Sequence, residues 1–318
     1  MGGRWVTGML LAGAVLLGAC GDPASGPQAA RPAPSAPGQA EASPPTLPPS
    51  EPSAPGVPGT TRHSAPRAPV KAPTVLYIGD SLATENQRVL GQELRRDLRA
   101  HYRSVPYSGT TLCDYLEGTG ERSLVPDADK AAALVRAVRP DFVVLQFWGN
   151  SWGYTPCMDG ITYDASRGRY LARYAADARR LAEQIDAAGR DRRPRVVWVL
   201  QGPDPVTPDR VRRVNAVYQE RAAATGDLVA DAGRAVSAAG ARYSWTQYLP
   251  CTPYERARPA YCTQPGSDRT ALHRDDDHLH FCLAPTTSTP KPCPVRSPGV
   301  LRIAREITRA VGEAARSR

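Results

Sequence analysis

Short apolar segments alternate with helix-like segments between residues 75 and 314, and this alternation constrains the fold more than any other feature of the chain. The segment 141–147 is apolar at almost every position, as expected of a parallel strand that is buried on both faces. Similar segments predict further strands at 75–78, 102–107, 195–200 and 227–230. Because helical periodicity separates them, the sequence predicts an α/β fold, a three-layer α/β/α sandwich with a five-stranded parallel sheet.

Amphipathic periodicity locates the helices between these strands. Helices are predicted at 82–100, 127–139 and 300–314, and two more around 174–185 and 211–218. The stretch 240–298 is instead rich in Pro, Cys and Tyr and shows little periodicity. A loop of that length is unusual unless it is functional or stapled, and we expect it to shape the substrate pocket.

Polar residues follow each of the first three predicted strands. Ser81, Gly109 and Asn150 lie just past the carboxyl ends of these strands, where open parallel sheets bind their ligands. Ser81 lies where a strand ends and a helix begins, so its hydroxyl is near free backbone N–H groups and the positive end of the helix dipole. The N–H groups of Ser81 and Gly109, with the side-chain amide of Asn150, would form an oxyanion hole for acyl transfer. Taken singly, each residue also suits a structural role, as a helix N-cap, a turn glycine or a loop asparagine.

A general base is expected in the stretch 273–280, which holds three of the five histidines and three consecutive aspartates. Asp277 and His280 are three residues apart, so one turn of chain can set the carboxylate against Nδ1 and leave Nε2 free for Ser81. Asp275 and His278 have the same spacing. We favour the pair Asp277 and His280 because Phe281 follows it, and a bulky apolar neighbour can anchor the loop. A metal site and an inert acidic loop are the alternatives for this cluster.

Four sequence blocks together resemble the SGNH/GDSL hydrolase family of serine esterases. They lie in the family's order and spacing between residues 74 and about 312, and read Gly79-Asp80-Ser81-Leu82, Tyr107-Ser108-Gly109-Thr110-Thr111, Trp148-Gly149-Asn150-Ser151 and Asp277-His278-Leu279-His280-Phe281. The resemblance implies a flavodoxin-like SGNH hydrolase fold, a catalytic triad of Ser81, Asp277 and His280, and an oxyanion hole made by Ser81, Gly109 and Asn150. It implies no metal and no organic cofactor.

The third block departs from the family pattern. The family usually has Gly-x-Asn-Asp, whereas the chain keeps only Asn150 in register and has Ser151 in place of the aspartate. The missing aspartate is not a member of the triad. The departure therefore affects the expected surroundings of the oxyanion hole and of the substrate pocket rather than the triad.

The amino-terminal segment predicts export. A positive start precedes an apolar run at 6–17, which is too short to span a bilayer as a mature helix. The run ends in Leu17-Gly18-Ala19-Cys20, which resembles a bacterial lipobox and implies cleavage before Cys20 and lipidation of its thiol. An ordinary signal peptide with an incidental cysteine is the alternative. We expect the protein at the outer face of the bacterial cell membrane, or otherwise secreted.

The segment 21–73 is predicted to be a disordered, proline-rich linker. It carries 15 of the 32 prolines, no aromatic residue and only Leu47, Val57 and Val70 as large aliphatic residues. Such a segment buries too little apolar surface to offset its ordering entropy. The predicted organisation is therefore a signal peptide at 1–20, this linker, and a catalytic domain at 74–318.

Six cysteines remain when Cys20 is set aside. In an oxidising compartment an even number indicates disulfides, and six cysteines allow 15 pairings. None of the spacings is a Cys-x-x-Cys, which argues against a zinc site. Local loops favour two short-range pairs and leave one long-range pair, namely Cys251 with Cys262, Cys282 with Cys293, and Cys113 with Cys157.

The formal net charge of the chain is +9. The arginines are scattered over predicted helix faces, which is typical of a solvated surface, and export disfavours nucleic acid as a partner. We interpret the protein as a monomeric, exported, membrane-tethered serine ester hydrolase that acts on acyl esters of envelope or extracellular carbohydrate or lipid. An acyltransferase to a glycan hydroxyl is one alternative. A non-catalytic lipoprotein that binds glycan through Trp148, Trp152, Tyr154 and Trp245 is the other.

Overall fold

The computed structural model describes residues 71–150, 152–190, 192–285 and 291–317. All of them belong to one compact unit, Ala65–Arg318. The predicted signal peptide at 1–20, the lipidation site Cys20 and the linker up to residue 70 lie outside the described residues. Among the described helices, none combines the length and the apolar character needed to cross a membrane.

A five-stranded parallel sheet forms the centre of this unit, with strand order β2-β1-β3-β4-β5. Val75 of β1 is paired with Tyr102 of β2 on one side and with Phe142 of β3 on the other. This strand order is the flavodoxin-like one, so the predicted fold class is confirmed. The strands are β1 (Thr74–Gly79), β2 (His101–Ser104), β3 (Phe142–Gln146), β4 (Arg195–Val199) and β5 (Leu228–Ala230).

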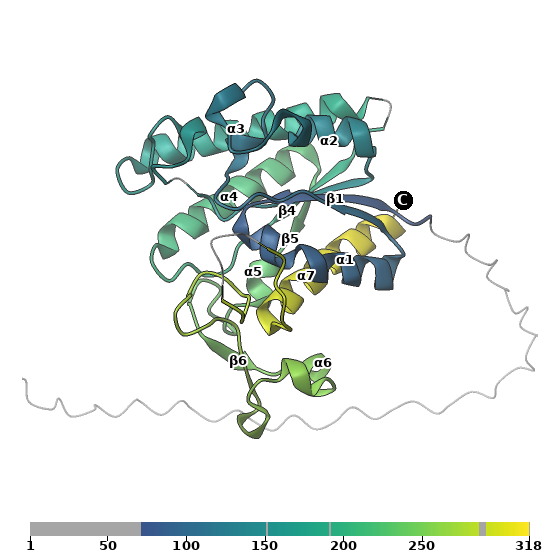
Figure 1. Cartoon of the computed structure of the whole chain (residues 1–318), viewed down its shortest axis with the longest axis vertical. Coiled ribbons are helices and arrows are strands. Elements are labelled where there is room, and N and C mark those ends of the chain that lie inside the picture. The colour runs from purple at the N-terminus through teal and green to yellow at the C-terminus, as the bar shows by residue number, and fades with distance from the viewer. Residues whose placement is uncertain (1–70, 151, 191, 286–290, 318) are drawn as a thin grey trace, which may run out of the picture. The chain divides into compact units, whose positions relative to one another are not determined.

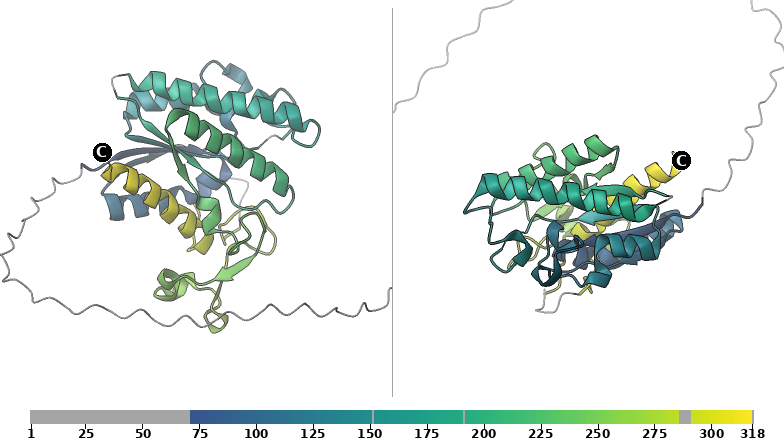
Figure 2. Two further views of the ribbon diagram at one scale, coloured as in Figure 1. Left: turned by 180° about the vertical axis from the view of Figure 1, so that it is seen from behind. Right: turned by 90° about the horizontal axis from the view of Figure 1, so that it is seen from above.

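Helices cover both faces of the sheet (Figure 1, Figure 2). On one side lie α1 (Ser81–Leu98), α5 (Ala232–Ala235) and α7 (Pro298–Arg316), and on the other α2 (Ala131–Val138), α3 (Arg167–Gly189) and α4 (Pro208–Thr225). Because successive strand residues point to opposite faces, Val144 packs toward α1 and α7 whereas Val143 packs toward α2 and α3. The molecule therefore has two apolar cores, one on each face of the sheet.

Several element ends differ from the sequence-based expectation. β2 ends at Ser104 rather than Tyr107. Val105 and Tyr107 nevertheless still donate to Tyr77 O and Gly79 O of β1, both at 2.9 Å. The predicted helix 127–139 begins as a 3₁₀ turn and is interrupted at Lys130, whose backbone is extended. The 3₁₀ turns are Leu112–Tyr115, Gly120–Arg122, Asp127–Asp129, Pro156–Met158, Pro259–Tyr261 and Pro265–Ser267.

The stretch 240–298 is more ordered than its lack of periodicity predicts. It forms an antiparallel pair, β6 (Tyr248–Pro250) with β7 (Arg269–Ala271), and a short helix α6 (Pro253–Arg256) that extends away from the sheet (Figure 1). Leu249, Leu272 and Phe281 of this stretch are buried in the core on the α1 and α7 face of the sheet, and two disulfides cross-link its short elements. The three disulfides join Cys251 with Cys262, Cys282 with Cys293, and Cys113 with Cys157, as the sequence predicts.

Candidate active site

The turn between β1 and α1 places Ser81 at the amino end of α1. Gly79 permits this turn because a Cβ there would lie 2.1 Å from the backbone oxygen of Gln146 in β3. Asp80 caps α1, with its Oδ1 accepting the N–H of Leu82 at 3.0 Å. Ser81 is therefore the first residue of the helix, at the positive end of its dipole.

His280 reaches Ser81 from the other end of the domain sequence. Its Nε2 lies 3.0 Å from Ser81 Oγ, and its Nδ1 lies 3.0 Å from Oδ2 of Asp277. Asp277 also accepts the backbone N–H of His280 at 3.0 Å. This second hydrogen bond holds the carboxylate against the imidazole ring of the same residue. An ionised carboxylate can only accept hydrogen bonds, so Nδ1 carries the proton and Nε2 accepts from the Ser81 hydroxyl.

The charges around His280 favour its protonated form. Burial by itself lowers the pKa of His280, but the hydrogen bond to Asp277 and the negative charges of Glu85, Asp277 and Asp80 raise it above its ordinary value of 6.5. Burial would raise the pKa of Asp277, but hydrogen bonds from the ring and the backbone of His280 hold it well below its usual range. A proton taken from Ser81 would therefore stay on the imidazole and not pass to Asp277.

The second Asp–His pair of the same spacing does not reach Ser81. Asp275 and His278 are both exposed. Asp275 accepts the side-chain amide of Gln247, and the His278 ring packs edge-on against Trp245, with 5.2 Å between the ring centres. The hydrogen-bonded line to Ser81 is thus made by Asp277 and His280.

Two further loops close around the nucleophile turn. Tyr107 N–H donates to Gly79 O at 2.9 Å, so the segment that contains Gly109 lies over the end of β1. Gly109 has a φ of +78°, which favours glycine, and a Cβ there would lie 3.3 Å from the ring of Tyr154. The side-chain amide of Asn150 donates to Thr110 O at 3.0 Å. The structure therefore brings the loops of Gly109 and Asn150 together with Ser81.

Asp80 links the nucleophile turn to the Asn150 loop. Its carboxylate is buried, and Oδ2 accepts the N–H of Trp148 at 2.6 Å and lies 3.5 Å from Nδ2 of Asn150. Burial raises the pKa of Asp80 to about 6, against the lowering effect of the N–H groups of Trp148 and Leu82. The carboxylate thus orders the surroundings of Ser81 through the N–H groups of Leu82 and Trp148.

The ordering roles of Trp152, His273 and Glu85 were not predicted from the sequence. Trp152 donates its indole N–H to Oδ1 of Asn150 at 3.1 Å, which fixes the orientation of that amide. Nδ1 of His273 lies 2.9 Å from the backbone oxygen of His280, and Glu85 accepts N–H groups just after His280. Glu85 could have been found as an acidic residue on the apolar stripe of α1, three residues after Leu82 and four before Val89.

Exposed aromatic side chains border the site. Trp152 and Tyr154 are 43% and 58% exposed, whereas Trp148 is buried beneath Trp152 in a stacked arrangement. Trp245 contacts His273 and His278 instead. Of the four aromatic residues considered as a glycan-binding surface, Trp152 and Tyr154 are thus the ones next to Asn150 and Gly109.

Within the described residues, two groups of side chains lie close enough together to suggest metal ligands. Both include a disulfide, Cys113–Cys157 beside Asp114 and Cys251–Cys262 beside Asp268. Their sulfurs are already bonded to each other, so they cannot act as the thiolate ligands that a zinc site uses.

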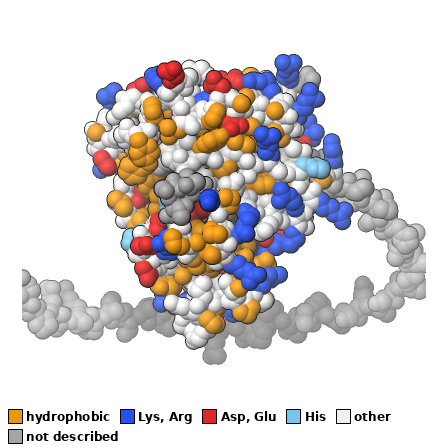
Figure 3. Space-filling view, in the orientation of Figure 1, with side chains coloured by type: hydrophobic (Ala, Val, Ile, Leu, Met, Phe, Trp, Pro, Cys, Tyr) orange, Lys and Arg blue, Asp and Glu red, His pale blue; other side chains and the backbone are white. Residues whose placement is uncertain are grey.

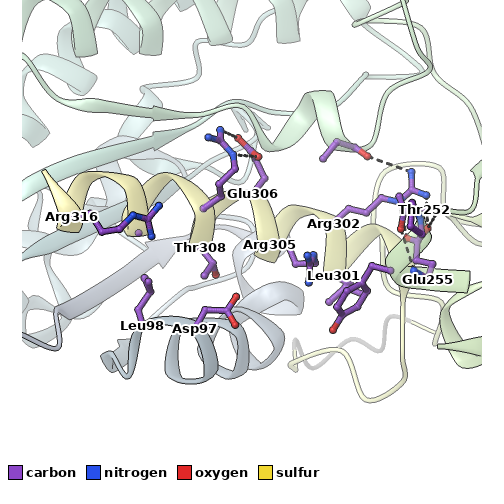
Figure 4. A pocket seen from close by; sticks show the side chains of 15 residues that line it. Asp97, Leu98, Thr252, Glu255, Leu301, Arg302, Arg305, Glu306, Thr308 and Arg316 are labelled. Carbon is purple, nitrogen blue, oxygen red and sulfur yellow. Dashed lines mark hydrogen bonds and ion pairs between the residues drawn. The ribbon is translucent and has the colours of Figure 1, made fainter. Parts of the chain in front are cut away.

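A cavity of about 680 Å³ lies apart from Ser81, between α7, α6 and the carboxyl end of α1 (Figure 4). Arg302 in this cavity binds Glu255 at 2.6 Å, and Arg305 lies over the ring of Tyr254. Neither Ser81 nor His280 lines it.

On the face of the molecule in Figure 3, Lys and Arg side chains gather on the side where α7 ends, interspersed with apolar ones.

No protein-family model matches the sequence, and no curated protein matches it. Solved structures are similar to the chain at low identity. A family 3 carbohydrate esterase of Clostridium thermocellum is 14% identical, with 78% of this chain and 98% of that chain covered and a TM-score of 0.43. A protein of Desulfitobacterium hafniense described as a lipolytic protein of the G-D-S-L family is 13% identical, with 74% and 98% covered and a TM-score of 0.42. The periplasmic domain of a Salmonella Paratyphi A lipopolysaccharide acetyltransferase is 10% identical, with 76% and 84% covered and a TM-score of 0.45.

Proposed function

We propose that this protein is a serine ester hydrolase that works through Ser81, His280 and Asp277 and a covalent acyl-enzyme. One observation carries the proposal. The Ser81 hydroxyl, the imidazole of His280 and the carboxylate of Asp277 form a hydrogen-bonded line with both distances at 3.0 Å. A nucleophile, a base and a residue that orients the base are the three parts that acyl transfer by serine requires.

The reaction follows from this geometry. His280 Nε2 takes the proton of Ser81 as Oγ attacks the ester carbonyl carbon, and Asp277 stabilises the imidazolium that forms. The N–H groups of Ser81 and Gly109 and the amide of Asn150 hold the oxyanion of the tetrahedral intermediate. His280 then gives its proton to the departing alkoxide, which leaves as an alcohol. Water, deprotonated by His280, repeats the sequence and releases the acid with Ser81 restored.

The substrates we propose are acyl esters of envelope or extracellular carbohydrate or lipid. Two features support this class. The amino-terminal sequence predicts export, and the exposed rings of Trp152 and Tyr154 next to Asn150 and Gly109 offer apolar faces for a sugar ring or an acyl chain.

We also propose that a lipid on Cys20 holds the protein at the outer face of the cell membrane. The lipobox-like sequence that ends at Cys20 supports this location. Cys20→Ser should move the protein from the membrane fraction to the soluble exported fraction, because the multiple acyl chains of a lipoprotein bind firmly. An unchanged membrane fraction would contradict lipidation.

A panel of esters tests the function. The purified protein is offered acetyl, butyryl and octanoyl esters of one chromogenic alcohol, then acetylated glycan and glycerolipid, with Ser81→Ala as the control. Release of free acid by the wild type and not by Ser81→Ala supports hydrolysis, and the preferred chain length defines the acyl group. Acyl groups recovered on an added sugar would indicate transfer instead. Equal rates for wild type and Ser81→Ala would refute the proposal.

A further inference from the structure

We propose that Glu85 is a positioning residue that sets His280 against Ser81. This inference rests on the proposed roles of Ser81 and His280. Glu85 lies on α1 one helical turn after Ser81, so the two side chains share one side of the helix. Glu85 is buried, with 4% of the residue exposed, and its carboxylate binds backbone N–H groups that follow His280 in the chain.

The carboxylate holds the chain just after His280. Oε1 accepts the N–H of Phe281 and Oε2 accepts the N–H of Cys282, each at 3.0 Å. Hydrogen bonds from two neighbouring N–H groups to the two oxygens of one carboxylate fix both the distance and the orientation of the backbone. The helix that carries the nucleophile therefore also carries the attachment point of the base.

The same turn of α1 holds the other end of the disulfide-closed segment. The backbone oxygen of Glu85 accepts the N–H of Cys293 at 3.0 Å, and the Arg88 guanidinium donates to Cys293 O at 2.7 Å. The Cys282–Cys293 disulfide joins the two attached ends. His280 is thus followed at once by a segment that is tied to α1 at both ends.

Glu85 also acts on the charge of His280. Burial raises the pKa of Glu85 to about 7, while the positive charge of His280 and the two N–H groups lower it. In turn the negative charge of Glu85 helps to raise the pKa of His280. The other titratable groups that face His280 are Asp277, Asp80 and His273. Removal of the Glu85 charge should therefore lower the pKa of the base, which a role in packing alone would not do.

The test compares two Glu85 variants with a matched control. Glu85→Gln removes the charge and leaves one backbone N–H without an acceptor. We expect kcat to fall about 10- to 100-fold through misplacement of His280, with KM unchanged. The acidic limb of the pH profile of kcat/KM should move to lower pH, because the negative charge of Glu85 is one of the causes that raise the pKa of His280. Glu85→Asp keeps the charge but is too short to reach both N–H groups, so kcat should fall while the acidic limb stays in place.

Glu93→Gln is the control, because Glu93 is also a buried carboxylate of α1 but binds Arg96 on the same helix at 2.6 Å. It should leave kcat and the pH profile unchanged. A folded Glu85→Gln with wild-type kcat and an unshifted limb would overturn the inference, while Ser81→Ala tells separately whether the proposed function stands. If Glu85→Gln does not fold, the kcat of Glu85→Asp tests the inference. A wild-type kcat for Glu85→Asp would then overturn it.

Discussion

Ser81 and His280 are separated by 199 positions in the sequence, yet Nε2 of His280 lies 3.0 Å from Oγ of Ser81. The fold explains this meeting. Ser81 begins α1, the loop with His280 precedes α7, and α1 and α7 pack side by side on one face of the sheet. The loop before α7 therefore lies at the carboxyl end of β1, next to Ser81.

The first prediction concerns which histidine is the base. His280→Ala should lower kcat by about 10⁴-fold, and Asp277→Ala should lower it strongly but less. His278→Ala and Asp275→Ala are the matched controls, since they have the same spacing but are exposed and contact Trp245 and Gln247. They should keep most of the activity in an assay with one short activated ester. The reverse ranking in folded variants would assign the base to His278.

The second prediction is the pH dependence of the reaction. His280 must be neutral to accept a proton, so kcat/KM should rise with pH through the pKa of His280. Because Asp277, Glu85 and Asp80 raise that pKa, the midpoint of the acidic limb should lie above 6.5. In Asp277→Asn the midpoint should move down as the negative charge is lost. A wild-type midpoint below 6.5 would contradict the electrostatic account of the site.

The third prediction concerns the amide of Asn150. Trp152→Phe keeps an aromatic ring over Trp148 but removes the N–H that binds Asn150 Oδ1 at 3.1 Å. It should lower kcat several-fold without changing the thermal midpoint, whereas Asn150→Ala should cost about 10²- to 10³-fold as the loss of an oxyanion donor. Steady-state kinetics with an acetyl ester measure both. Wild-type kcat in Asn150→Ala would remove this residue from the oxyanion hole.

The fourth prediction compares two disulfides of equal span. Cys251–Cys262 and Cys282–Cys293 both join residues 11 positions apart, so replacing either pair by serines should cost about 2 to 3 kcal/mol of unfolding free energy. Thermal unfolding measures this cost. Only the second pair follows His280 and binds Glu85, so only its loss should also lower kcat. Equal kcat values in the two double variants would show that the Cys282–Cys293 link does not position His280.

The sheet could be predicted because each strand is a short, mainly apolar segment that the sequence itself shows. β3 is buried on both faces and is therefore apolar throughout, which few other structures allow. The two disulfides of short span were predictable for a similar reason, since nearby cysteines need little ordering of the chain to meet. In both cases the information is local in the sequence.

The parts that the sequence does not predict depend on contacts between distant segments. β6 and β7 are three residues each and have no alternation to detect, and the Cys251–Cys262 disulfide holds the chain between them. The contacts of Glu85 with the N–H groups of Phe281 and Cys282 span almost 200 residues. The donor that orients Asn150 is the indole of Trp152, and a helical or strand pattern carries no trace of such a contact.

The hydrolysis of a short activated ester by wild type and by Ser81→Ala tests the central claim most directly. The account predicts that the wild type turns over the ester and forms a mass adduct of one acyl group on the peptide that contains Ser81. Ser81→Ala should retain the fold, form no adduct and be slower by about 10⁴-fold or more. A folded Ser81→Ala that hydrolyses the ester at the wild-type rate would contradict the account.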